Sequence, residues 1–194
     1  MNTDYKKDYL TIEKKYWWFR ARRYWLKTLC TQNNKIIELG AGSAQNIKDL
    51  PGKKTALDIS SYGKKEAQKN KITYVISKAE KTKFKDNSFD DVIALDVLEH
   101  IKNETKAIKE WERIAKKRII LSVPAYQWLW SKHDDINHHV KRYSLRELKQ
   151  LIKNNTNLKI KRISYWNFFL FPLAVIQKKL TKNAELKLLP KPIN

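Results

Sequence analysis

Short apolar runs alternate with polar, helix-prone stretches through most of the chain. The runs rich in β-branched residues predict strands at 35–39, 54–58, 72–77, 90–95, 118–123 and 158–164. The stretches between them predict helices at 45–50, 61–70, 103–116 and 144–154, after a helical N-terminal segment. Ser144 and Glu147 match a capping box at the start of the last helix. This alternation predicts an α/β fold, a Rossmann-like, doubly wound, mostly parallel sheet with helices on both faces.

The length of 194 residues suits one domain with a full hydrophobic core. Within a single domain at 1–194, we expect an N-terminal helical segment (1–30), a Rossmann-like core (31–166) and a basic, apolar C-terminal segment (167–194). No signal peptide is expected at the start. The longest apolar run, 168–176, is shorter than the roughly 20 residues that a spanning helix requires.

The chain is strongly basic, with 41 Lys and Arg against 20 Asp and Glu and a net charge of +21. Such an excess favours anionic partners, among them nucleic acid, an acidic membrane leaflet and phosphorylated or carboxylated substrates. The alternative is that the net charge of +21 reflects compositional drift in a Lys-rich chain and no particular partner. The single Cys30 excludes an intramolecular disulfide and a cysteine metal cluster, which fits a reducing compartment, so we expect a cytoplasmic protein.

The first predicted strand runs into the sequence ELGAGSAQN. Gly40 and Gly42 allow a tight strand-to-helix turn that backbone can use to approach a ligand. Asp58 ends the second strand, 20 positions after Glu38, where a carboxylate can accept the hydroxyls of a ribose. A turn that serves only the fold is the alternative. The third glycine of a nicotinamide fingerprint is missing, because position 45 is Gln. Together these features favour a nucleoside cofactor.

In these motifs the chain resembles the class I S-adenosylmethionine-dependent methyltransferases. The matching stretches are IIELGAGSAQN, ALDIS, AEKTKFKDNSFDDVIALDVLEHI and VPAYQWLWSKHDDINHHVKRYS, in the family's order and spanning roughly 13–170. The opening YWWFRARR together with HVKRYS is similar to a type 11-like bacterial and archaeal subgroup associated with envelope glycan, lipid or secondary metabolism. The resemblance implies S-adenosylmethionine as cofactor and S-adenosylhomocysteine as product.

The resemblance also implies roles for individual residues. Glu38 and the turn Gly40, Ala41 and Gly42 would hold the amino-acid end of the cofactor, and Asp58 the ribose. Ile59 would cover one face of adenine, and Asp96 would border the methionine portion and the sulfonium. The family usually has an acid where this chain has Lys78, so backbone at Ala79, or Glu80, would replace that contact.

Transfer of a methyl group to oxygen requires a base, for which histidine is suited. Of the four histidines, we favour His139, in HVKRYS after the fifth strand; a loop histidine hydrogen-bonded to Asp134 is the alternative. Asp96, Glu99 and His100 resemble a D-x-x-E-H metal site of some quinone-pathway methyltransferases. Acidic residues are also favourable at the N-terminus of a helix, which accounts for this pattern without a metal, so we expect no metal.

Several aromatic and cationic side chains are candidates for the acceptor side. Arg142 and Tyr143 would orient an anionic or carbonyl-bearing substrate, or else form a hydrogen-bonded loop clasp. Tyr126, Trp128 and Trp130 alternate, so on an extended segment their rings would share one side, as a pocket lining or as a core strand.

The helix expected at 13–27 combines aromatic rings with arginines. We expect it to close over the site as a lid or, alternatively, to be packed permanently on the sheet. As a lid, its aromatic residues would exclude water and one of two arginines would meet an anionic group: Trp17, Trp18 and Phe19, with Arg20 or Arg23.

The C-terminal part predicts further contacts. Residues 141–194 hold 13 Lys and Arg and 2 Asp and Glu, a net charge of 13 − 2 = +11 around an apolar run, which describes a surface for peripheral contact with an anionic membrane. A core helix with a solvated basic face is the alternative. The family's final antiparallel strand is apparently missing, and an open sheet edge predicts a homodimer.

The sequence therefore predicts an S-adenosylmethionine-dependent methyltransferase acting on a small or lipid-linked acceptor, most readily at oxygen. Nucleic-acid methylation is an alternative that charge and aromatics favour. Methyltransferases that act on base amino groups usually carry an Asn- or Asp-Pro-Pro-aromatic tetrad after the fourth strand. This chain reads ALDVLEH there, so nucleic acid is not the expected partner. A non-catalytic cofactor-binding module is the third possibility.

Overall fold

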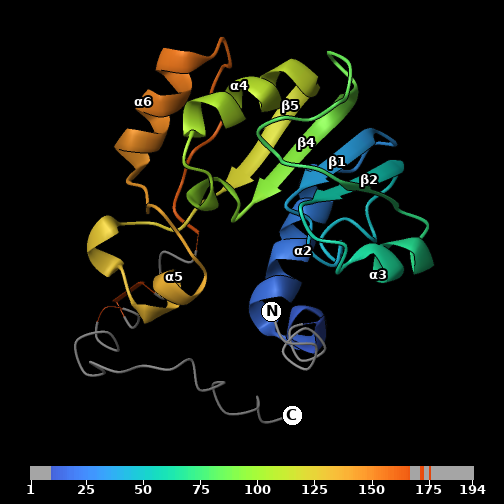
Figure 1. The fold of residues 1–194 in the computed structure, drawn as a ribbon, viewed down its shortest axis with the longest axis horizontal. Helices are drawn as coiled ribbons and strands as arrows, with labels where there is room; N and C mark the ends of the chain where they lie inside the picture. The colour runs from blue at the N-terminus through green and yellow to red at the C-terminus, as the bar shows by residue number, and fades with distance from the viewer. Residues whose placement is uncertain (1–9, 167–170, 173–174, 176–194) are drawn as a thin grey trace. The chain divides into compact units, whose positions relative to one another are not determined.

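The computed structural model describes residues 10–166, 171–172 and 175. The chain divides into two compact units, one formed by 1–98 with 103–122 and the other by 99–102 with 123–194. The first unit contains the sheet, and the second contains short helices and loops (Figure 1). The predicted C-terminal segment 167–194, with its apolar run at 168–176, lies almost wholly outside the described residues.

The sheet of the first unit has five parallel strands in the order β3-β2-β1-β4-β5. Their bounds are β1 Lys35–Leu39, β2 Lys53–Asp58, β3 Thr73–Ile76, β4 Phe89–Leu95 and β5 Ala115–Ser122. The predicted strands at these positions are confirmed, with ends that differ by up to three residues. The strand order reverses between β1 and β4, and ligands of such sheets bind outside the carboxyl ends of the strands at this reversal.

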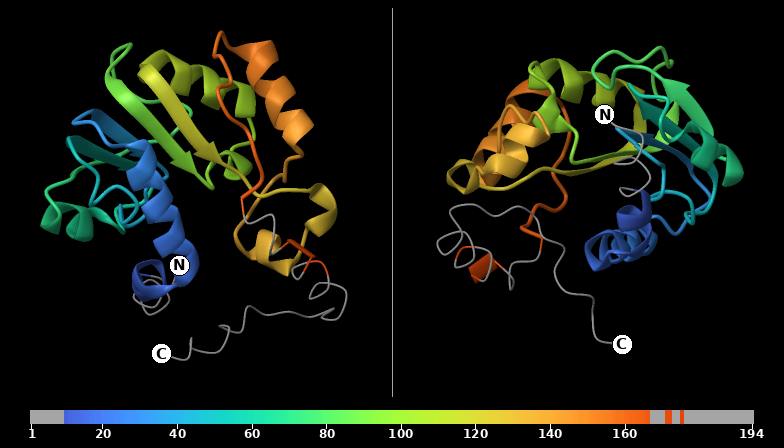
Figure 2. Two further views of the ribbon diagram at one scale, coloured as in Figure 1. Left: turned by 180° about the vertical axis from the view of Figure 1, so that it is seen from behind. Right: turned by 60° about the horizontal axis from the view of Figure 1, so that its bottom comes forward.

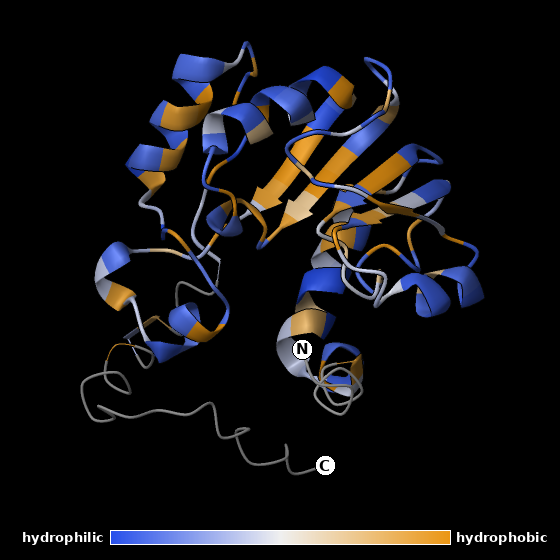
Figure 3. Cartoon of the chain, in the orientation of Figure 1, coloured by the Kyte–Doolittle hydropathy of each residue, from blue (hydrophilic) through white to orange (hydrophobic). Residues whose placement is uncertain are grey.

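Alternate residues of the strands face two different layers of helices. Ile36, Ala56 and Ile93 share one buried cluster with Leu26 of α2 (Trp17–Leu29) and Ala67 of α3 (Lys64–Lys69). On the other side, α4 (Glu104–Ile114) contacts β4 and β5 (Figure 1 and Figure 2). The strands are hydrophobic along most of their length, whereas the helices mix hydrophilic and hydrophobic residues (Figure 3). Helices therefore cover both faces, as predicted.

Two of the helices begin at a residue whose side chain caps the first turn. The side chain of Asn103 accepts a hydrogen bond from Lys106 N and caps α4. In the second unit, α6 (Leu145–Asn155) opens with the predicted Ser144–Glu147 capping box, which is confirmed. This unit also contains the 3-10 turn η2 (Gln127–Leu129) and α5 (Lys132–Ile136).

Two predicted elements are wrong. Residues 45–50 form turns, because Ala44 has a left-handed φ of 58° and Pro51 follows after too few residues for a stable helix. Residues 158–164 form no strand. Burial alternates along most of this segment. A strand also requires backbone hydrogen bonds to a neighbouring strand, which an alternating pattern does not supply.

Candidate functional site

The turn after β1 depends on its glycines. Gly40 and Gly42 have left-handed φ angles of 62° and 50°. A Cβ on Gly40 would lie 2.4 Å from Cγ2 of Val97, so any side chain at this position would clash. The turn therefore keeps its backbone open at the carboxyl end of β1.

Asp58, the last residue of β2, holds this turn in place. Its Oδ2 accepts a hydrogen bond from Gly42 N at 2.9 Å, and its Oδ1 accepts one from Ser60 N at 2.8 Å. The hydroxyl of Tyr74 contacts the carbonyl oxygens of the same two residues, Gly42 at 3.1 Å and Ser60 at 2.9 Å. Each oxygen of a carboxylate accepts more than one hydrogen bond, so Asp58 keeps acceptor capacity for a diol.

Glu38 is a buried carboxyl beside the turn, with an exposed fraction of 1%. Oε1 accepts a hydrogen bond from Asn46 Nδ2 at 2.6 Å, whereas buried Oε2 has no hydrogen-bond partner among the residues that the structure describes. Burial raises the pKa of Glu38 to about 8, although the bond from Asn46 acts in the opposite direction. A cationic group at Oε2 would relieve this unfavourable burial.

The segment before the sheet adds two residues that the sequence analysis missed. Nη1 of Arg22 donates to Oδ2 of Asp96 at 2.5 Å, and the Ser43 hydroxyl donates to Glu13. Ser122 donates to the other oxygen of Asp96 at 2.9 Å. The signal for Arg22 was its spacing of four residues from Leu26, which put both side chains on the buried face of one helix.

The structure favours a packed helix over a lid in 17–29. Leu26 is fully buried in the sheet's core, and Arg22 is fixed to Asp96. Of the two arginines named in the lid hypothesis, Arg20 is exposed, and Arg23 donates to the carbonyl oxygens of Glu13 and Lys14 at 2.6 and 2.9 Å. The aromatic residues differ in burial: Trp17 is 42% exposed, and Trp18 and Phe19 are half-buried.

The residues expected near adenine have contrasting environments. Ile59, directly after β2, is 74% exposed, which is unusual for an aliphatic side chain and suits a surface that a ligand covers. Ala79 is buried, and its carbonyl oxygen accepts a hydrogen bond from Trp111 Nε1 at 3.0 Å. Glu80 is half-buried.

In the second unit, Asp134 is a fully buried carboxylate at the centre of a polar cluster. Arg142 donates to both of its oxygens, from Nε at 2.7 Å and from Nη2 at 2.9 Å. Nδ1 of His139 lies 2.9 Å from Oδ1. Because an ionised carboxylate only accepts, this contact places the proton on Nδ1 and leaves Nε2 as an acceptor. Burial by itself raises the pKa of Asp134, but hydrogen bonds from Arg142, His139 and Ser131 lower it well below its usual range.

The Arg142 and Tyr143 pair corresponds to the clasp alternative. The third nitrogen of Arg142 donates to the Ala125 carbonyl oxygen at 3.2 Å, so each guanidinium nitrogen has a partner within the loop. Tyr143 is 2% exposed, and its backbone pairs with the loop at Pro124 and Tyr126. These contacts favour the clasp alternative over a substrate-orienting role.

The aromatic residues of VPAYQWLW do not form an extended row. Tyr126 has a left-handed φ of 59°, and η2 follows it, so the rings are not all on one side. Tyr126 stacks on Tyr165, with ring centroids 5.0 Å apart. Trp130 instead donates from Nε1 to Asp135 Oδ1 at 2.8 Å. A cavity of about 160 Å³ adjoins Tyr126, Tyr165 and Phe171.

Three side chains in the second unit have metal-ligating atoms close together. Ligand atoms of Glu99, His100 and His139 lie within 4.8 Å of one another, and the two imidazole centroids are 4.7 Å apart. This grouping differs from the D-x-x-E-H pattern, since its third member is His139 and not Asp96. The same geometry also suits a histidine pair without metal.

Known proteins share both this fold and a sequence family. The chain superposes on a Haloferax volcanii putative methyltransferase, solved in complex with the methyltransferase activator Trm112, with a TM-score of 0.64 and 15% identity over 90% of this chain and 89% of that one. It also matches a Thermotoga maritima SAM-dependent methyltransferase, described as a possible histamine N-methyltransferase, with a TM-score of 0.63 and 18% identity over 77% and 75% of the chains. At these identities the likeness establishes the fold.

A sequence family matches the central part of the chain. Residues 37–123 match the model of a methyltransferase domain family. They form a class I methyltransferase domain. An uncharacterised Methanocaldococcus jannaschii protein is 35% identical over 89 residues, which span 45% of this chain and 43% of that relative. S-adenosylmethionine is the cofactor of this domain class.

The residues of the first unit fit that cofactor. Its methionine part carries an ammonium and a carboxylate, and in this unit the buried Oε2 of the Glu38 carboxyl and the buried Nε of the Arg22 guanidinium have no hydrogen-bond partner in the described chain. Asp58 would supply acceptors for ribose hydroxyls, and Ile59 would offer an exposed apolar surface to adenine.

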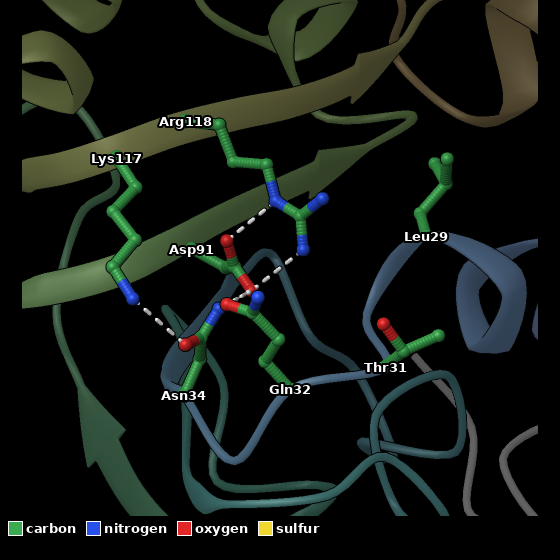
Figure 4. A pocket seen from close by; sticks show the side chains of 7 residues that line it. All are labelled: Leu29, Thr31, Gln32, Asn34, Asp91, Lys117 and Arg118. Carbon is green, nitrogen blue, oxygen red and sulfur yellow. Dashed lines mark hydrogen bonds and ion pairs between the residues drawn. The ribbon is translucent and has the colours of Figure 1, made fainter.

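A cavity of the first unit, of about 250 Å³, is lined by polar side chains that bind one another (Figure 4). It adjoins Asn34, just before β1, and the early residues of β4 and β5. Arg118 donates to both oxygens of buried Asp91, at 2.6 and 3.0 Å, and Lys117 donates to Asn34 Oδ1 at 3.0 Å. Because these cations already have partners, the cavity is not the candidate site.

The described residues include no helix that is long and apolar enough to cross a bilayer.

Proposed function

We propose that the chain transfers a methyl group from S-adenosylmethionine to a small or lipid-linked acceptor, at oxygen. The main support is one edge of the sheet: β1 and β2 end in Glu38, the open glycine turn and Asp58, with Asp96 after β4. Acceptors for a ribose, a buried carboxyl for an ammonium and an open backbone turn meet where a doubly wound sheet binds ligands.

The cofactor supplies a methyl group activated by its sulfonium, and the protein's task is alignment. If the protein holds the methyl donor rigidly, the acceptor, the methyl carbon and the sulfur can lie in one line, as an in-line displacement requires. The turn at Gly40 and Gly42 is fixed by Asp58, which itself is anchored at the end of β2. The cofactor half of the site is therefore organised before ligand arrives.

His139 is the proposed general base. Asp134 fixes its Nδ1 proton, so Nε2 is the acceptor for the proton of a hydroxyl. The orientation of a histidine by a buried carboxylate is the arrangement that other catalytic bases use. A purely structural histidine would make the same bond to Asp134, so only turnover separates the two roles.

Calorimetric titration with S-adenosylmethionine and S-adenosylhomocysteine tests the proposal. We expect micromolar binding of both. Incubation with radiolabelled methyl donor and separated lipid and aqueous metabolite fractions should then give labelled product. Binding without label in any fraction would favour the non-catalytic module, and label in RNA or DNA would favour nucleic-acid methylation. Absence of binding to the folded protein would contradict the proposed function.

Replacement of His139 by alanine should lower the turnover number at least 100-fold, on the order of what general base catalysis contributes. Affinity for S-adenosylhomocysteine should stay within about threefold. The matched control is His138→Asn, since His138 is exposed and has a left-handed φ of 56° that asparagine tolerates. Wild-type turnover of His139→Ala would return His139 to a structural role. Loss of wild-type turnover on treatment with a chelator would instead indicate a metal at Glu99, His100 and His139.

A lipid-linked acceptor is supported by the net charge of +21 and by exposed aromatic residues on α2, Trp17 at 42% and Tyr24 at 73%. We therefore propose peripheral contact with anionic membranes. Sedimentation with anionic vesicles tests it. A homodimer through the edge strand β5 is proposed from the sheet order, and is tested by the mass in solution.

A further inference from the structure

Arg22 is a buried cation in the helix that precedes the sheet. Its exposed fraction is 9%, and its guanidinium carbon lies 5.0 Å from the centroid of the Phe19 ring. Nη1 makes the bond to Asp96, but the buried Nε has no hydrogen-bond partner in the described part of the chain. A buried donor without a partner costs free energy, so its retention requires a reason.

The surroundings of Arg22 are acidic. Its charge acts on the carboxyls of Glu13 and Glu38, in each case lowering a pKa that burial raises, and Asp58 acts on both of these carboxyls as well. Together with Asp96, three carboxyl groups therefore interact with this one guanidinium. A phosphate or another purely anionic ligand would be repelled by this set. A zwitterion, with an ammonium for the carboxyls and a carboxylate for the guanidinium, matches it in charge.

We infer that Arg22 binds the α-carboxylate of the cofactor's amino-acid part, while Asp96 keeps the guanidinium in position. The inference rests on the proposed function and assigns the cofactor's carboxylate to α2, outside the matched family segment 37–123. With Nη1 on Asp96, the Nε and Nη2 edge is the one that meets a carboxylate bidentately. The alternative is that Arg22 only pairs with Asp96.

The ligands that separate these roles differ by one group. S-adenosylhomocysteine carries the carboxylate, S-adenosyl-3-thiopropylamine lacks only that group, and 5′-methylthioadenosine lacks the whole amino-acid part. For the wild-type chain, calorimetry should give about 10- to 100-fold tighter binding of S-adenosylhomocysteine than of the thiopropylamine, the range of a charge-assisted hydrogen-bonded pair. Equal affinities would overturn the inference, and this comparison requires no variant.

Arg22→Gln should lower the affinity for S-adenosylhomocysteine about 10- to 100-fold and leave that for the thiopropylamine and for 5′-methylthioadenosine within about threefold. Arg22→Lys, which keeps the charge but not the planar fork, should give a smaller loss with the same selectivity. The matched control is Lys27→Gln, on the same helix, where the side chain is half-exposed and pairs with Asp49 at the surface.

Each outcome has one meaning. An equal loss of affinity for all three ligands would show that Arg22 only positions Asp96, and unchanged binding of S-adenosylhomocysteine to Arg22→Gln would remove the contact; both overturn the inference while leaving the proposed function intact. A wild-type chain that is folded and binds none of the three ligands would instead remove the proposed function and the inference with it.

Discussion

Replacing Asp58 by alanine is expected to abolish measurable binding of S-adenosylhomocysteine, a loss of about 10²- to 10⁴-fold. Two hydrogen bonds from ribose hydroxyls to a carboxylate contribute about 1.5–3 kcal/mol each. Asp58 also accepts the backbone bonds from Gly42 and Ser60, so the variant loosens the glycine turn as well. Calorimetry measures the affinity, and circular dichroism checks that the sheet is retained.

The two contributions of Asp58 are separable with ligands. The wild-type chain should prefer 5′-methylthioadenosine over its 2′,3′-dideoxy counterpart, and the Asp58→Ala variant should bind the two with similar, weak affinity. A preference that survives the substitution would place the diol elsewhere. Asp49→Asn is the matched control, because Asp49 is an exposed acid of the same unit whose ion pair with Lys27 lies at the surface. Its affinity should match that of the wild type.

The sheet was predictable because local pattern and tertiary role agree in its strands. The apolar run at β1 has a buried side chain at four of five positions, and a strand buried on both faces leaves a continuous apolar signature. The alternation with helices then fixed a parallel arrangement. The helix predicted at 45–50 was wrong because the local sequence does not reveal the left-handed φ of Ala44.

The candidate site was predictable where its residues follow strands in the sequence. Glu38, the glycine turn and Asp58 are all within three residues of a strand end, so the topology alone brings them together. Arg22 and Glu13 precede the sheet and reach Asp96 and Ser43 over 74 and 30 residues of sequence. No local spacing encodes such a contact. The motif order indicated a cofactor, whereas the partner of its carboxylate required coordinates.

The loops of the second unit were hardest to predict, because their hydrogen bonds connect side chains to irregular backbone. VPAYQWLW has the alternation of a strand, but Tyr126 turns the chain with its left-handed φ and η2 follows. Arg142 has the chemistry of a substrate ligand, yet Asp134 and Ala125 already take its three nitrogens. A cation's availability depends on its neighbours, and residue type alone does not give it.

Asp134→Ala is expected to destabilise the protein by about 3–5 kcal/mol, since removal of one partner leaves the other charge buried. Arg142, whose side chain is 16% exposed, would lose both bonds to the carboxylate, and His139 would lose its orienting contact. Because the folded state holds the pKa of Asp134 below its usual range, this contribution is complete above the ordinary aspartate range. It is lost as the pH falls toward the folded-state pKa. Urea unfolding at pH 7 and at pH 3 measures both effects.

The control for Asp134 is its neighbour on the same short helix. Asp135 is exposed and its side chain accepts a hydrogen bond from Trp130 Nε1, so Asp135→Ala should cost about 1 kcal/mol or less. The double variant Asp134→Ala with Arg142→Ala should be destabilised by less than the sum of the single variants, because no unpaired cation remains. Additive losses would mean that the two side chains contribute to stability independently.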